Sequence, residues 1–164
     1  MTLSVELSIE DPAWAAVADL ENLAEHTLAV ALGESGKAVE RAAEVSCLFC
    51  DDATIRALNA QWRGQDKPTN VLSFPAGTPA AADAIRLLGD IVLGFETVER
   101  EAREEGRPLD AHVAHLLVHG LLHLLGHDHA EPREAEAMEA LETRIMRKLG
   151  RADPYADRPE AGAP

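Results

Sequence analysis

Residues 108–129 read PLDAHVAHLLVHGLLHLLGHDH, and this stretch tells more about the fold than any other part of the chain. Apolar residues lie nearly all round the helix that residues 108–125 would form, which is typical of a helix buried at the centre of a domain. Gly126 then favours the left-handed conformation that ends a helix. We therefore expect one long central helix, followed by a turn that brings the chain back toward it.

Six of the seven histidines fall within this stretch. His119 and His123 are four residues apart, so both imidazoles project from one face of the helix and can hold one metal ion. The turn at Gly126 can bring His129 to the same ion. Three histidines leave a fourth position open, as in a catalytic zinc site. We predict one Zn²⁺ per chain, held by His119, His123 and His129.

The neighbouring polar residues leave alternatives open. His115 has the same four-residue spacing to the first predicted ligand, but that pair lacks a glycine and a third histidine at the right distance downstream. For His112 and His115 we expect roles in the core or in support of the ligands. His127 is an alternative third ligand. Asp128 either orients an imidazole through its second ring nitrogen or is a solvated turn residue.

The sequence around this helix predicts a small sheet. Alternating apolar residues indicate a half-buried strand over 3–9, and further strands are expected over 42–50, 71–74 and 89–93. Residues 75–88 form a long connection. Other helices are expected from Pro12 to Gly33 and over 51–61, 96–105 and 134–149. We predict an α+β (mixed α/β) fold with a four-stranded mixed sheet covered by about five helices. One domain spans 1–150, and 151–164 is a flexible tail.

Composition excludes several classes of protein. The chain has 164 residues, 46% of them hydrophobic, which suits a single globular domain and excludes a disordered chain. The net charge is −14, with 29 acidic residues against 15 basic ones. This argues against a protein that coats nucleic acid through its overall field. No membrane-length apolar stretch or secretory signal is seen, so we expect a cytoplasmic protein without a membrane partner.

The two cysteines, Cys47 and Cys50, form a C-x-x-C inside the strand expected over 42–50. Side chains three apart on a strand point to opposite faces and cannot pair well. We expect two reduced, packed thiols, and a redox or metal role is the alternative.

The spacing of residues 119–129 is also that of the metzincin metalloproteases. Gly120 stands where those enzymes place the glutamate that acts as general base. A metzincin-like metalloprotease, or another metallohydrolase on the same three histidines, is therefore an alternative function. Glycine inside a helix costs about 1 kcal/mol relative to alanine. Its presence beside the first predicted ligand indicates close approach of another chain or of a substrate, and packing is an equal alternative.

Three blocks carry a resemblance to a known family. Residues 119–129 fit the signature H-G-x-x-H-L-x-G-x-D-H, with His127 where a tyrosine is common. Residues 58–74, residues 89–92 and the acidic last helix around 138–142 also look alike. The chain thus resembles the bacterial YbeY-type metallo-endoribonucleases, the rRNA maturation factors, over most of residues 50–149.

The resemblance implies hydrolysis of single-stranded RNA, maturation of the 16S rRNA 3′ end and a role in ribosome quality control. The partners it implies are the ribosome or small-subunit assembly proteins, and DNA is not expected. A ribosome-assembly factor with a structural metal and no catalysis is a further alternative.

Hydrolysis of a phosphodiester needs a nucleophile, a cation and a proton acceptor. Zinc can lower the pKa of bound water to about 7. Arg63 is the candidate catalytic cation, because its planar donors match phosphate oxygens, and pairing with a carboxylate is the alternative. Lys67 is a candidate phosphate contact, or an ordinary solvated lysine. Trp62 is expected in the core, with base stacking as the alternative. The proton acceptor stays open between Asp128, a phosphate oxygen and metal hydroxide.

Charge is unevenly distributed between the predicted site and the rest of the surface. Arg63 and Lys67 stand against one acid, Asp66, whereas the last helix is rich in glutamates. Glu131, Glu134, Glu136, Glu139 and Glu142 are counted among those surface acids. Because few phosphates can be neutralised, we expect weak, salt-sensitive binding to bare RNA.

Overall fold

The computed structural model describes residues 2–36, 42–77 and 85–156. Four strands form one sheet in the order β1-β2-β4-β3. β1, β2 and β4 run parallel, and β3 runs antiparallel to β4. The strands are β1 Leu3–Ile9, β2 Ala43–Cys50, β3 Val71–Pro75 and β4 Arg86–Gly94. The mixed four-stranded sheet that the sequence predicts is therefore confirmed.

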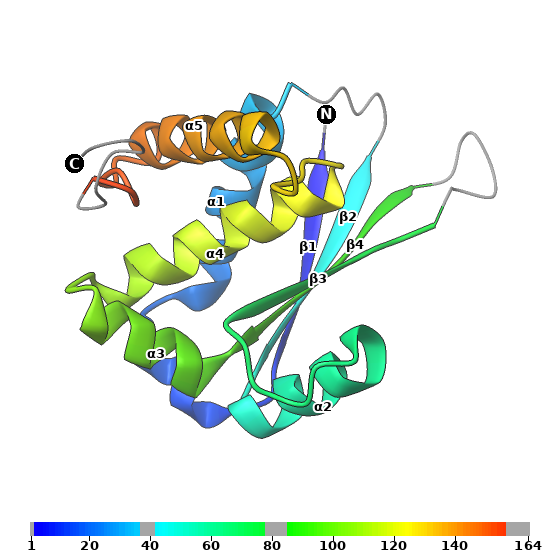
Figure 1. The fold of residues 1–164 in the computed structure, drawn as a ribbon, viewed down its shortest axis with the longest axis vertical. Coiled ribbons are helices and arrows are strands. Elements are labelled where there is room, and N and C mark those ends of the chain that lie inside the picture. Colours follow the sequence, from blue (N-terminus) through cyan, green and yellow to red (C-terminus); the bar gives the residue numbers. More distant parts are fainter. Residues whose placement is uncertain (1, 37–41, 78–84, 157–164) are drawn as a thin grey trace.

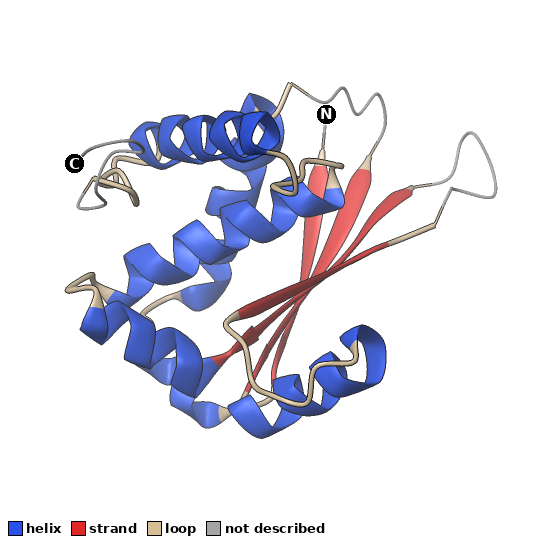
Figure 2. Cartoon of the chain, in the orientation of Figure 1, coloured by secondary structure: helices blue, strands red, loops and turns tan. Residues whose placement is uncertain are grey.

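Helices cover the two faces of this sheet unequally. Figures 1 and 2 show α1, α3, α4 and α5 together on one side of the sheet, and α2 by itself near β3. A short 3-10 helix, η1, precedes α1. The helical elements are η1 Pro12–Ala16, α1 Leu20–Glu34, α2 Asp52–Arg63, α3 Phe95–Glu104, α4 Leu109–Leu124 and α5 Pro132–Lys148.

The main core lies between the sheet and α4. As the sequence predicts, α4 is buried on nearly every side, and Val113, Leu117 and Leu121 are fully buried. They belong to one apolar cluster with side chains such as Ile91 of β4 and Phe49 of β2. A smaller cluster, which includes Ile55, lies under α2. The long apolar run therefore does what its composition suggests: it forms the centre of the domain.

Both ends of the first long helix differ from the prediction. The first long helix begins at Leu20 rather than at Pro12, because the Trp14 side chain is buried and its indole N–H donates to the Cys50 carbonyl at 2.9 Å. The chain then changes direction at Asp19, whose φ is +51°. Gly33 does not end this helix, which continues to Glu34. Tertiary anchoring of Trp14 thus overrides a good local start signal.

The two least regular segments are only partly described. Of the predicted connection over 75–88, residues 78–84 lie outside the described residues, and β4 already begins at Arg86. Of the predicted tail over 151–164, residues 157–164 lie outside them. In the described part, Arg151 pairs with Asp110 of α4 at 3.3 Å, and Pro154 is buried. Residues 151–156 are therefore attached to the domain in this structure.

Gly89 is the position in the sheet where we expect the largest loss of stability on substitution. Its φ is +139°, and a Cβ there would lie 2.2 Å from the carbonyl oxygen of Phe74 on β3. Both the backbone conformation and the space exclude a side chain. We expect Gly89→Ala to lower the free energy of unfolding by about 3 kcal/mol, measured by urea denaturation of the metal-free protein.

Gly33→Ala is the matched control for this experiment. Gly33 lies inside α1, and a Cβ there meets no atom within 4 Å. Alanine should therefore leave stability unchanged or raise it by up to about 1 kcal/mol. Equal stability of Gly89→Ala and the parent protein would show that the strand pair has more freedom than its geometry indicates.

Cys47 and Cys50 are both free and buried, in two different apolar clusters. This agrees with the prediction of two packed thiols on opposite faces of the strand. Burial raises the pKa of each thiol to about 12, helped by nearby acids such as Asp90 and Asp51. We expect neither thiol to react with Ellman's reagent at pH 8 until urea unfolds the chain. Rapid reaction of the folded protein would instead indicate an accessible, redox-active pair.

Candidate metal centre

The C-terminal end of α4 brings the predicted ligands together. The His127 amide donates to the Leu122 carbonyl at 2.9 Å and the Gly126 amide to the His123 carbonyl at 3.1 Å. With Gly126 at φ +96°, this is the Schellman arrangement that reverses the chain after a helix. The reversal carries His129 back beside the last turn of α4, as the sequence predicts.

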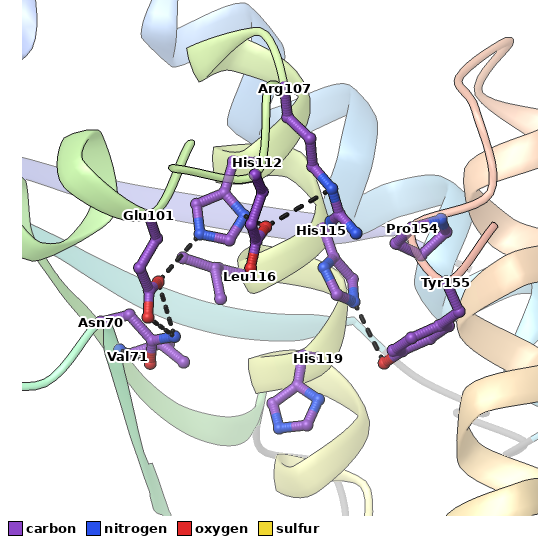
Figure 3. Close-up of a pocket in the computed structure, with 11 residues that line it drawn as sticks. Asn70, Val71, Glu101, Arg107, His112, His115, Leu116, His119, Pro154 and Tyr155 are labelled. Carbon is purple, nitrogen blue, oxygen red and sulfur yellow. Dashed lines mark hydrogen bonds and ion pairs between the residues drawn. The ribbon is translucent and has the colours of Figure 1, made fainter. Parts of the chain in front are cut away.

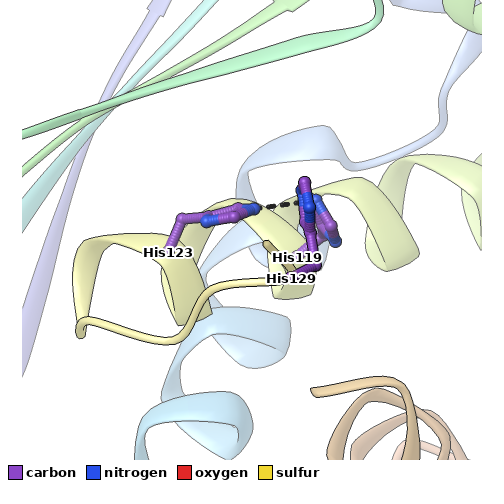
Figure 4. Close-up of side chains that lie close together, drawn as sticks. All are labelled: His119, His123 and His129. Carbon is purple, nitrogen blue, oxygen red and sulfur yellow. Dashed lines mark hydrogen bonds between the residues drawn. The ribbon is translucent and has the colours of Figure 1, made fainter. Parts of the chain in front are cut away.

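His119, His123 and His129 form one cluster, shown in Figure 4. Each offers a ring nitrogen, and these three nitrogens lie within 4.8 Å of one another. The Nε2 atoms of His119 and His123 are 3.1 Å apart. Tetrahedral zinc with bonds of about 2.0–2.1 Å would place two ligand nitrogens about 3.3 Å apart. The donor set and its spacing therefore fit a zinc ion.

The protonation of His123 also suits a metal ligand. Burial holds the pKa of His123 below its ordinary value, and positive charge on the neighbouring His119 or His129 ring would lower it further. The ring is therefore neutral near pH 7, and neutral imidazole has the free lone pair that a metal requires. Burial and the two neighbouring histidines thus favour the form of His123 that binds a cation, and together they outweigh the opposing field of Asp128.

A pocket of about 580 Å³ opens beside the cluster and is lined by the three histidines together with Arg63, Ser73 and Asp128. α2 extends two residues beyond its predicted end, so Arg63 is its last residue rather than part of a loop. The Arg63 Nη2 donates to the Ser73 carbonyl at 2.5 Å, and its guanidinium lies over the Phe74 ring. No carboxylate of the described chain forms an ion pair with Arg63. Its charge is thus available at the pocket.

Three other residues that the sequence singles out, Trp62, Asp66 and Lys67, do not line this pocket. Lys67 is exposed and is not among the residues that line this pocket. Asp66 pairs with Arg56 at 2.9 Å rather than with Arg63. Trp62 is 63% exposed, so the prediction that it packs in the core is wrong. It lines a separate groove on the open face of the sheet.

Asp128 and His127 flank the cluster without joining it. The Asp128 carboxylate accepts from the backbone N–H of His129 at 2.7 Å, which shapes the turn. Among the described residues, no hydrogen bond joins that carboxylate to an imidazole ring. His127 lines the pocket, but its ring nitrogens are not part of the three-nitrogen group.

Glu142 makes the contact that the sequence suggests for Asp128. Its side chain is fully buried, so counting it among the surface acids was wrong. The Nδ1 of His119 donates to Glu142 Oε1 at 2.5 Å, and Glu142 Oε2 contacts His115 and the Tyr155 hydroxyl. Burial alone would raise the pKa of Glu142, but hydrogen bonds from His115, His119 and Tyr155 lower it to about 2.

A sequence signal for Glu142 does exist. Met138, Leu141 and Ile145 form the apolar stripe of α5, and Glu142 stands within it. An acid on a buried face needs a partner, but the identity of that partner depends on how α5 packs against α4. His112, by contrast, has the core role predicted for it: it is buried and its Nε2 lies 2.9 Å from Glu101 Oε1.

Gly120 lies where α4 presses on the sheet. A Cβ there would lie 3.0 Å from Ile91 Cγ2 and 3.1 Å from Ser73 Oγ, and Ser73 Oγ donates to the Gly120 carbonyl at 3.2 Å. This supports the packing explanation for the glycine. The same contact leaves little room for the glutamate that a metzincin protease carries at this position.

Comparison with known proteins agrees with this geometry. The profile of the family described as Endoribonuclease YbeY matches residues 8–150. The Endoribonuclease YbeY of Methylocella silvestris is 50% identical over 153 residues, covering 93% of this chain and 86% of that protein. The one from Sinorhizobium medicae is 50% identical over 164 residues, covering 96% and 97%. A solution structure from Thermotoga maritima matches with a TM-score of 0.55 and 25% identity, covering 96% of this chain and all of that one.

The fold, the histidine cluster and the relatives together identify the chain as an endoribonuclease, which is a hydrolase that acts on RNA. The chain belongs to the YbeY family, as its signature over 119–129 suggests. No helix in the described part of the chain is both long and apolar enough to cross a bilayer.

Proposed function

We propose that this protein is a zinc-dependent endoribonuclease that hydrolyses single-stranded RNA, with His119, His123 and His129 as the metal ligands. The proposal rests on the meeting, at a single pocket, of three histidine nitrogens and a guanidinium that pairs with no carboxylate of the described residues. Negative charge develops on a phosphodiester as it is hydrolysed. A metal ion and the planar N–H donors of an arginine beside it can both stabilise that charge.

Each residue at the pocket then has a distinct task. A bound zinc ion supplies Lewis acidity and lowers the pKa of water toward neutrality. Arg63 uses one donor to hold the Ser73 carbonyl, which fixes the guanidinium and leaves its other N–H groups for a phosphate. Asp128 is the one carboxylate among the residues lining this pocket and is thus the protein group available to take a proton. Lys67 acts at most on a distant phosphate.

Cleavage assays with purified protein test the proposal. The substrates are a labelled single-stranded RNA, the same RNA in a duplex and a DNA strand of the same sequence. We expect cleavage of the single-stranded RNA only, abolished by a chelator and restored by zinc. His123→Ala, purified in parallel, exposes any contaminating nuclease. Peptide hydrolysis without RNA cleavage would favour the metalloprotease alternative.

We further propose that the cytoplasmic substrate is 16S rRNA at its 3′ end, with the ribosome or small-subunit assembly proteins as partners. This finer assignment rests on the family resemblance of residues 58–74 and 119–129. Cells depleted of the protein should accumulate 16S rRNA with an extended 3′ end, and His119→Ala should not correct it. Full correction by that variant would favour an assembly factor whose metal is structural.

A further inference from the structure

Glu142 is a charged residue in a place where packing alone does not need one. Its side chain is 0% exposed, and it lies on the face of α5 that covers α4. Met138, Leu141 and Ile145 already supply the apolar surface of that face. A buried carboxylate is costly to desolvate, and an apolar residue of similar volume often serves stability at least as well. The charge of Glu142 therefore calls for a reason beyond packing.

One of the contacts of Glu142 is with a predicted metal ligand, His119. Within the described chain its ionic contacts are with two histidines of α4, His119 at 2.5 Å and His115 at 3.4 Å, and with no lysine or arginine. The Tyr155 hydroxyl donates to the same carboxylate. Figure 3 shows Tyr155 reaching toward His115, with His119 one turn further along α4.

The contact with His119 decides which nitrogen of that ring is available. A carboxylate only accepts hydrogen bonds, so the Nδ1 of His119 carries the proton. In the neutral ring, Nε2 is then the unprotonated atom, and this is the atom that lies 3.1 Å from the Nε2 of His123. The carboxylate thus fixes both the tautomer and the orientation of the ring.

We propose that Glu142 is a positioning residue for the metal centre, holding His119 as an Nε2 ligand, and that Tyr155 in turn fixes Glu142. This rests on the proposed assignment of His119, His123 and His129 as ligands. Carboxylates bonded to the second nitrogen of a metal-binding histidine commonly act in this way. The segment after α5 then contributes to the metal centre indirectly, because its Tyr155 holds Glu142 and Glu142 holds His119.

The anchoring of Tyr155 supports this extension of the site. Asp153 accepts from the Tyr155 backbone N–H at 2.8 Å and from the Thr143 hydroxyl at 3.1 Å. Arg151 pairs with Asp110 near the start of α4. The segment before Tyr155 is thus tied to both α5 and α4, and these ties place the hydroxyl at Glu142.

Zinc affinity of the full-length protein tests the inference, measured by competition with a chromogenic chelator after removal of metal. We expect Glu142→Gln, which keeps the shape but loses the charge, to raise the Kd for zinc about 10- to 100-fold. Tyr155→Phe should raise it by a smaller factor, about threefold to tenfold. Glu136→Gln is the matched control, because Glu136 is an exposed acid on the same helix.

A second readout separates positioning from a general effect on the fold. Cobalt replaces zinc, and its visible absorption reports the geometry of the ligands. Glu142→Gln should change the position or intensity of these bands while the metal-free protein keeps its native circular dichroism. Unchanged bands together with a Kd within twofold of the parent protein would overturn the inference. Should Glu142→Gln not fold, the Tyr155→Phe affinity decides in the same way.

The failure of this inference can be told from failure of the metal site itself. If the parent protein and His119→Ala bind zinc equally, the ligand assignment is wrong and the inference falls with it. If His119→Ala loses zinc but Glu142→Gln and Tyr155→Phe bind it like the parent, the ligands stand and only the role of Glu142 is rejected.

Discussion

His119→Ala and His123→Ala are each expected to raise the Kd for zinc by roughly 100-fold or more, because each removes one of three ligands. Both imidazoles project from one face of α4, and their Nε2 atoms are 3.1 Å apart. No neighbouring side chain can take the place of either one unless the helix changes its conformation. His129→Ala should act in the same direction. Metal content after dialysis against micromolar zinc is the measurement.

His26→Ala is the control for these variants. His26 is an exposed histidine of α1, outside the three-histidine group, so its loss should leave one zinc per chain. Full zinc occupancy in both His119→Ala and His123→Ala would mean that the metal, if any, binds elsewhere. Loss of zinc from all four variants would point to a general loss of fold instead.

Arg63→Ala is expected to keep zinc and native stability but to lower RNA cleavage about 100- to 1000-fold, the usual cost of losing one donor to developing charge. The guanidinium is already held in place by the Ser73 carbonyl and the Phe74 ring, and its removal leaves no buried partner uncompensated. The loss should therefore appear in kcat more than in folding. Single-turnover cleavage of a labelled RNA measures it.

Two further variants sharpen this test. Arg63→Lys should recover only part of the rate, because an ammonium keeps the charge but lacks the planar donors. Arg56 is an exposed arginine of the same helix, α2, and pairs with Asp66. Arg56→Ala removes the same charge as Arg63→Ala and should cleave RNA like the parent protein. Equal cleavage by Arg63→Ala and the parent protein would remove Arg63 from the mechanism.

The parts of the fold that the sequence predicts well are those with a strong local pattern. The alternation of residues 3–9, the apolar run of α4 and the glycine turn at Gly126 each lead to the observed element. The start of α1 could not be predicted in this way, because it depends on Trp14. That ring packs against Phe49 and Phe95, from strand and helix segments distant in the chain.

In the candidate site too, the residues set by a local pattern are predictable and those set by tertiary packing are not. The three histidine ligands are predictable because a helical spacing and one glycine turn bring them together within residues 119–129. Glu142 is not, because its contact with His119 forms only when α5 folds onto α4. Arg63 reaches the pocket because α2 packs against β4 and the guanidinium bonds the Ser73 carbonyl of β3, which no local pattern encodes.

The short span of the ligands affects how zinc and folding are linked. Because all three histidines lie within residues 119–129, the unfolded chain can also chelate the ion. A ligand that binds both states raises stability only by the difference between its two affinities. Zinc should therefore raise the melting temperature by less than its affinity for the native protein suggests. The native state differs from the unfolded chain in the residues that only folding brings to the site. Glu142 and Tyr155 are the ones that lie far from residues 119–129 in the sequence.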